Sequence, residues 1–178
     1  MKLLKLVALI SLLNISISAQ EQNMTPIQTP VTGKEFTTCE NDSCQKHAAL
    51  DQFYKAFNTG DMKLMAENWH NDENIAMDNP LGGIKRGWGE IKAVYERIFN
   101  GGATVYVEFY DFTIIEFDGG FVAIGRERGS VEVKGKTVEL KIRTSRVYKL
   151  IDGSYKQVHH HGSIEDPALL KEYQDLVR

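Results

Sequence analysis

The sequence lacks the excess of positive charge that nucleic-acid-binding proteins use. It carries 21 Lys and Arg residues against 24 Asp and Glu residues, and its formal net charge is −3 at pH 7. Because Lys and Arg contacts to phosphate supply most of the affinity for nucleic acid, we expect no nucleic-acid partner. The same balance gives no support for binding to an anionic membrane surface.

The sequence also lacks the short motifs that indicate common enzyme and cofactor chemistry. It contains no Ser-His-Asp order, no glycine-rich phosphate loop and no HExxH zinc motif. The histidine run at residues 159–161 does not indicate a metal, because consecutive strand residues point to alternate faces and at most two of the three can converge. We therefore predict neither a cofactor nor a metal site.

Only the N-terminus has a continuous apolar run. Two lysines precede the apolar residues 6–13, and Ile-Ser-Ala at residues 17–19 offers small residues for cleavage. This pattern is typical of a secretory signal peptide, which we assign to residues 1–19. A membrane anchor would need about 20 apolar residues, and Asn14 interrupts the run too early. We expect export to the periplasm or the medium, and no membrane partner after cleavage.

Cysteine is scarce: Cys39 and Cys44 are the whole complement. In an exported protein, an even pair in a turn-rich segment predicts a disulfide rather than a metal site. The pair ends residues 20–44, which contain Pro26 and Pro30 among Thr, Gln and Asn. We predict that this stretch is a flexible leader.

The rest of the sequence contains helical periodicity first and strand periodicity afterwards. Helices are predicted from residue 45 to the Asn-Thr-Gly at 58–60, after an Asp61 cap, and over residues 88–99. After a short strand at 75–78, β-rich stretches follow at 104–117, 121–133, 136–150 and 154–163. The order indicates one α+β domain at residues 45–165 with a C-terminal helix at 166–178.

Three motifs resemble a known family. They are F-N-T-G-D at 57–61, N-P-L-G-G-I-K-R-G at 79–87 and R-V-Y-K-L-I-D-G-S-Y-K-Q-V-H-H-H-G-S at 146–163. In this order they resemble the association (hub) domain of calmodulin-dependent protein kinase II, within the nuclear transport factor 2-like and SnoaL-like superfamily. The resemblance implies a cone-shaped bent antiparallel sheet wrapped on three helices, a cavity between them, and a homodimer or higher assembly.

The resemblance also implies site residues. Arg126 and Arg146 fall on two pocket arginines of the family, whereas Gly162 stands where a third is expected. If the two share a pocket, they would bind a small anionic or polar organic ligand. The open alternative is an internal ion pair with Glu108, Glu127 or Glu139, because a buried guanidinium needs a partner.

Further candidates surround this pocket. Trp69, Trp88 and Tyr54 are expected to line it, although aromatic residues at these spacings also suit a core. An isomerase or dehydratase would use Asp78, Tyr95 or His160 for proton transfer. The sequence therefore predicts an exported small-molecule-binding protein, with such an enzyme and an oligomerisation module with a vestigial pocket as alternatives.

The disulfide can be tested directly. Protein isolated from its native compartment should gain two mass units when Cys39 and Cys44 are reduced, because one disulfide takes up two hydrogens. Intact mass measured with and without reductant checks this. Two free thiols in the unreduced sample would contradict it.

Overall fold

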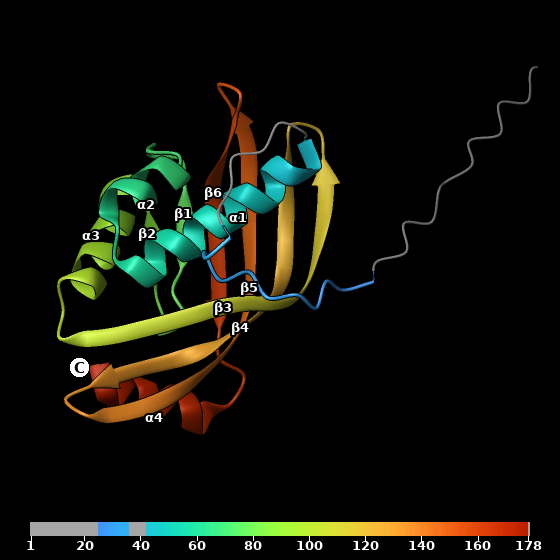
Figure 1. The fold of residues 1–178 in the computed structure, drawn as a ribbon. Coiled ribbons are helices and arrows are strands. Elements are labelled where there is room, and N and C mark those ends of the chain that lie inside the picture. Colours follow the sequence, from blue (N-terminus) through green and yellow to red (C-terminus); the bar gives the residue numbers. More distant parts are fainter. Residues whose placement is uncertain (1–24, 36–41, 178) are drawn as a thin grey trace, which may run out of the picture.

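The computed structural model describes residues 25–35 and 42–177. It confirms an α+β cone, in which helices cover a strongly bent, open six-stranded sheet (Figure 1). The helices are α1 (Asp42–Thr59), α2 (Met62–Asn68), α3 (Gly87–Phe99) and α4 (Pro167–Val177). The strands are β1 (Ala76–Asp78), β2 (Ile84–Arg86), β3 (Ala103–Phe117), β4 (Gly120–Val133), β5 (Lys136–Ile151) and β6 (Ser154–Ser163).

The predicted start and stop signals act where they were expected. The Asp61 carboxylate accepts a hydrogen bond from the Leu64 N–H at 2.9 Å and so caps α2. The two-residue turns at 134–135 and 152–153 have positive φ at both positions, as type I′ hairpin turns require. Local chemistry therefore sets the length and the pairing of the β4–β5 and β5–β6 hairpins.

The sheet has the strand order β2-β1-β6-β5-β4-β3. The long strands β3 to β6 form the predicted antiparallel meander, and β1 pairs in parallel with β6. β2, which the sequence reasoning missed, is a three-residue strand that pairs only with β1. Its shortness explains the omission, since three residues carry no readable alternation.

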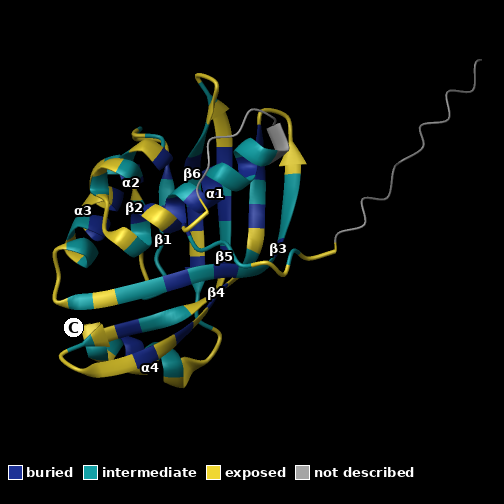
Figure 2. Cartoon of the chain, viewed as in Figure 1, coloured by how far each residue is buried: buried dark blue, intermediate teal, exposed yellow. Residues whose placement is uncertain are grey.

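A bend in the sheet creates the concave face. The β3–β4 register shifts between Tyr110 and Thr113, and Asp111 has a φ of 49°, as expected at a β-bulge. Across the bend, a Cβ atom added to Gly125 would lie 2.5 Å from the Phe112 Cβ, so only glycine allows this close approach. Figure 2 shows the buried residues gathered between the sheet and helices α1 to α3.

Residues 25–35, the N-terminal strap, belong to the predicted flexible leader and lie against β3. Ile27 and Val31 form isolated bridges to Phe112 and Phe109 on β3, with backbone N–H to carbonyl distances of 2.7 and 2.8 Å. Both residues also pack against the core. The sequence reasoning did not predict these two apolar contacts, because the surrounding residues are polar or proline. Residues 1–24 and Cys39 lie outside the described residues, so the signal peptide and the disulfide stay predictions.

The valines of β3 and β4 do not form an apolar outward face for a dimer, because Val107 and Val131 are buried in the core. Apolar side chains exposed on β3 to β5 are instead those of Phe117, Ile124 and Leu150. Self-association stays a prediction. Within the described residues, no helix combines the length and apolar character needed to cross a membrane.

The strap yields a stability prediction with an internal control. Gly33 has a φ of 80°, and a Cβ added there would lie 2.1 Å from the Lys55 backbone nitrogen on α1. Gly135 has a φ of 78° but no atom within 4 Å of such a Cβ. Both Gly→Ala variants should lose about 1 to 2 kcal/mol from the left-handed conformation.

Gly33→Ala should lose roughly 1 to 3 kcal/mol more, because the methyl group forces the strap away from α1. Urea unfolding of the two variants measures this difference. Equal losses would show that the strap does not contact α1 as described.

Candidate functional site

A buried ion pair lies at the centre of the cone. Arg146 Nη2 is 2.6 Å from Glu127 Oε1, and the two side chains are only 2% and 5% exposed. The Tyr54 hydroxyl donates to the same carboxylate oxygen at 2.7 Å. Arg146 also donates from Nε to the Tyr54 oxygen and from Nη1 to Gln157 Oε1. We call these four residues, with the neighbouring polar side chains described below, the Arg146 centre.

Strand alternation and one aromatic ring position the guanidinium. Even-numbered residues of β5 point inward, and the residue opposite Arg146 on β4 is Ala123, whose small side chain leaves room. The guanidinium carbon lies 3.5 Å from the centroid of the Phe53 ring on α1. A cation at this distance from a ring face is attracted by the ring quadrupole. Arg146 is therefore held by charge, hydrogen bonds and stacking together.

Two polar atoms around this ion pair, Gln157 Nε2 and His160 Nδ1, are buried without a hydrogen-bond partner. Trp69 Nε1 and Tyr95 OH are buried beside them and interact with each other, although the contact is too poorly aligned to satisfy either atom fully. The four side chains are close neighbours: the rings of Trp69 and Tyr95 are 6.3 Å apart, and His160 lies opposite Arg146 in the β5–β6 register. Buried polar groups in native proteins are nearly always paired. A cluster of unpaired ones is typical of a place where a polar molecule binds.

The protonation of His160 follows from its other neighbour. The Thr144 hydroxyl donates its proton to the His161 carbonyl, so its oxygen accepts from His160 Nε2 at 3.0 Å. Burial, and after it the charge of Arg146, lowers the pKa of His160 well below its usual value. The imidazole is therefore neutral at pH 7, with its proton on Nε2. Its Nδ1 is left as a hydrogen-bond acceptor.

The Tyr95 hydroxyl is protonated as well. Burial raises the pKa of Tyr95 to about 12, although Arg146 and the Trp69 indole both act in the opposite direction. At neutral pH the hydroxyl can donate one hydrogen bond and accept others. The Arg146 centre thus offers donors and acceptors of fixed position in a desolvated interior.

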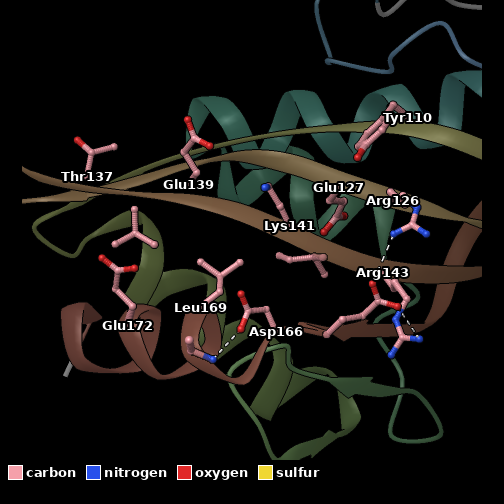
Figure 3. A pocket seen from close by; sticks show the side chains of 14 residues that line it. Tyr110, Arg126, Glu127, Thr137, Glu139, Lys141, Arg143, Asp166, Leu169 and Glu172 are labelled. Atoms are coloured by element: carbon pink, nitrogen blue, oxygen red, sulfur yellow. Dashed lines mark hydrogen bonds and ion pairs between the residues drawn. The ribbon is translucent and has the colours of Figure 1, made fainter.

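A cleft of about 530 Å³ lies between α4 and the β4–β5 hairpin (Figure 3). Arg126 and Arg143 stand at one end, and Thr137 and Glu172 at the other. Glu127 also lines this cleft, whereas the other residues of the Arg146 centre do not. The cleft therefore borders the Arg146 centre at Glu127.

The structure does not bring Arg126 and Arg146 together. Odd-numbered residues of β4 and even-numbered residues of β5 point into the core, so Arg126 points the other way and lies opposite Arg143. Its side chain is 48% exposed and pairs with Asp111 and Glu165 at 3.5 and 3.7 Å. Glu108, Glu127 and Glu139 were considered as ion-pair partners, and the structure pairs Arg146 with Glu127.

The remaining candidates divide in the same way. Tyr54, Trp69, Tyr95 and His160 all belong to the Arg146 centre. Asp78 does not, because its carboxylate contacts His161 Nδ1 at 3.0 Å on the partly exposed side of β6.

Trp88 is half-buried at the start of α3 and makes none of the contacts described above. Among the described residues, no three His, Cys, Asp or Glu side chains are grouped so that they could hold a metal ion.

Sequence reasoning did not single out Gln157, Thr144 or Phe53, and it considered Glu127 only as an ion-pair partner. A signal for Glu127 was present. It shares the inward, odd-numbered positions of β4 with Phe121 and Ala123. A carboxylate at an apolar strand position needs a buried partner.

A bent antiparallel sheet around three helices, with a polar centre inside, defines the cone-shaped fold of nuclear transport factor 2-like proteins. The family model for the SnoaL-like domain matches residues 47–167. The chain therefore belongs to the SnoaL-like domain family. No curated protein matches the chain.

Solved structures share this fold at low identity. A proposed calcium/calmodulin-dependent protein kinase type II association domain from Thiobacillus denitrificans is 22% identical, with a TM-score of 0.58, over 67% of this chain and 94% of that one. A nuclear transport factor 2-like protein from Salmonella enterica is 18% identical, with a TM-score of 0.62, over 68% and 91%. A proposed dehydratase from Streptomyces avermitilis is 19% identical, with a TM-score of 0.60, over 67% and 92%.

The two arginines should differ in their effect on stability. Arg146→Ala leaves the Glu127 carboxylate buried without its cation and should cost about 3 to 5 kcal/mol. Arg126→Ala removes only half-exposed pairs and should cost about 0 to 1 kcal/mol. Urea unfolding measures both values.

Arg146→Met combined with Glu127→Leu should regain part of the loss, since no buried charge is then unpaired. A similar loss for the two alanine variants would contradict the burial of the Arg146–Glu127 pair.

Proposed function

We propose that this protein is an exported small-molecule-binding protein, and that it holds a polar organic molecule at the Arg146 centre. One observation carries the proposal: Gln157 Nε2 and His160 Nδ1 are buried without partners beside one buried ion pair, and the Tyr95 hydroxyl is buried close by with its proton unused. Each unpaired buried donor or acceptor costs about 1 to 3 kcal/mol. A ligand that pairs with them removes this cost and gains affinity.

The size and position of the cleft support the same proposal. A cleft of about 530 Å³ is within the range of small-molecule sites. Glu127 belongs both to the cleft and to the Arg146 centre, so a molecule that enters beneath α4 would approach the centre from the side of Glu127. SnoaL-like and nuclear transport factor 2-like proteins include ligand-binding members, which makes this use of the cone reasonable.

A second candidate is an isomerase or dehydratase. The neutral His160 has a free acceptor nitrogen, and the Tyr95 hydroxyl is a free donor in the same interior. Such a pair could accept a proton from a bound molecule and donate one to it. A molecule recovered chemically unchanged after long incubation would favour binding. Turnover that stops in His160→Gln, with binding retained, would favour the enzyme.

Binding can be tested with conservative variants. A fragment that raises the melting temperature of the wild type should bind about three- to tenfold more weakly to Trp69→Phe and to Tyr95→Phe. Tyr95→Phe removes one neutral hydrogen bond worth about 1 kcal/mol and keeps the ring, and Trp69→Phe removes the indole N–H that interacts with the Tyr95 hydroxyl. Calorimetric titration gives the affinities.

Trp88→Phe is the matched control, because Trp88 makes none of the contacts of the Arg146 centre, and its affinity should equal that of the wild type. If no fragment binds, or if all three variants lose affinity equally, the Arg146 centre is not the binding site.

A further inference from the structure

We infer that the ligand of the Arg146 centre is uncharged and presents both a hydrogen-bond acceptor and a donor, as the amide group of a carboxamide or lactam does. The inference rests on the proposed function and names the class of molecule for that same site. The inferred ligand is uncharged, whereas a pocket shared by Arg126 and Arg146 would have favoured an anion.

The first argument is charge. The positive charge of Arg146 is matched by Glu127 at 2.6 Å. The other buried ionised side chains among the described residues face elsewhere, since Lys46 pairs with Glu116 and Asp51 accepts from the strap at Gly33. The charges of the Arg146 centre therefore sum to zero. A carboxylate ligand would be desolvated beside Glu127 with no second cation to compensate it, and a cationic ligand would meet Arg146.

The second argument is the pattern of donors and acceptors. Gln157 Nε2 and the Tyr95 hydroxyl can donate, the hydroxyl because its oxygen faces the Trp69 N–H and its own proton is unused. In contrast, His160 Nδ1 accepts, because the His160 proton is on Nε2. A carboxylate can pair with the two donors but has no proton for His160. An amide oxygen can accept from the donors while its N–H donates to Nδ1. The geometry thus calls for a molecule with both functions.

The two tryptophans of the chain make the test site-specific. Trp69 and Trp88 are the whole complement, so the nitrogen-proton NMR spectrum should contain two indole signals. Trp69→Phe identifies the signal of the Arg146 centre, and Trp88 serves as the internal reference. The probes are two pairs matched in size, benzamide with benzoate and nicotinamide with nicotinate.

We expect at least one of the two amides to shift the Trp69 indole signal and leave the Trp88 signal in place. The carboxylate of the same ring should bind at least tenfold more weakly at pH 7. Glu127→Gln, which has nearly the same shape, leaves the charge of Arg146 uncompensated. In that variant the preference should reverse, and the carboxylate should raise the melting temperature more than the amide does.

Two results would overturn the inference, and they differ in what else they reject. If a carboxylate shifts the Trp69 signal of the wild type as strongly as its amide, the inference is wrong and the proposed binding function stands. If neither member of either pair shifts it, the inference is wrong, and failure of a wider fragment screen at this signal would reject the proposed function too. The wild-type comparison decides both cases even if Glu127→Gln folds poorly.

Discussion

The buried ion pair between Arg146 and Glu127 constrains the interior of the cone more than any other interaction. Two charges can stay in a desolvated core only when each has a partner at short distance and its remaining hydrogen-bond capacity is used. This requirement fixes β4 against β5 and brings Tyr54 of α1 to the carboxylate. Strands, helix and polar centre are therefore coupled, and a change at either charge reaches all of them.

The bend of the sheet allows this pair to exist. The bulge in β3 and the close approach at Gly125 curve the long strands around α1. The concave face is therefore both the hydrophobic core and the wall of the polar centre. α4 covers the β4–β5 hairpin at the other end, so the cleft beneath it connects solvent with Glu127. The N-terminal strap pairs with the edge strand β3 through Ile27 and Val31.

The sequence identified most residues of the candidate site, but it did not show which of the candidates lie together. Tyr54, Trp69, Tyr95, His160 and Arg146 were all candidates, and the structure brings them together. Arg126 was grouped with them because it matches the position of a pocket arginine in the family. In β4, however, odd-numbered residues face the core, so Arg126 lies on the other face of the sheet. Which β4 residue pairs with Arg146 depends on the register of the hairpin, and the prediction joined the two arginines without applying that register.

The sequence by itself determined the order of helices and strands, the α+β class and the ends of most elements, because these depend on local periodicity, caps and turn residues. Its lack of excess positive charge also led to the expectation of no nucleic-acid partner. Only the tertiary structure decided that Arg146 is matched by Glu127 and that Gln157 Nε2 and His160 Nδ1 remain unpaired around it. These facts arise from contacts between residues up to 92 positions apart, such as Arg146 and Tyr54, and no local pattern specifies which buried groups meet.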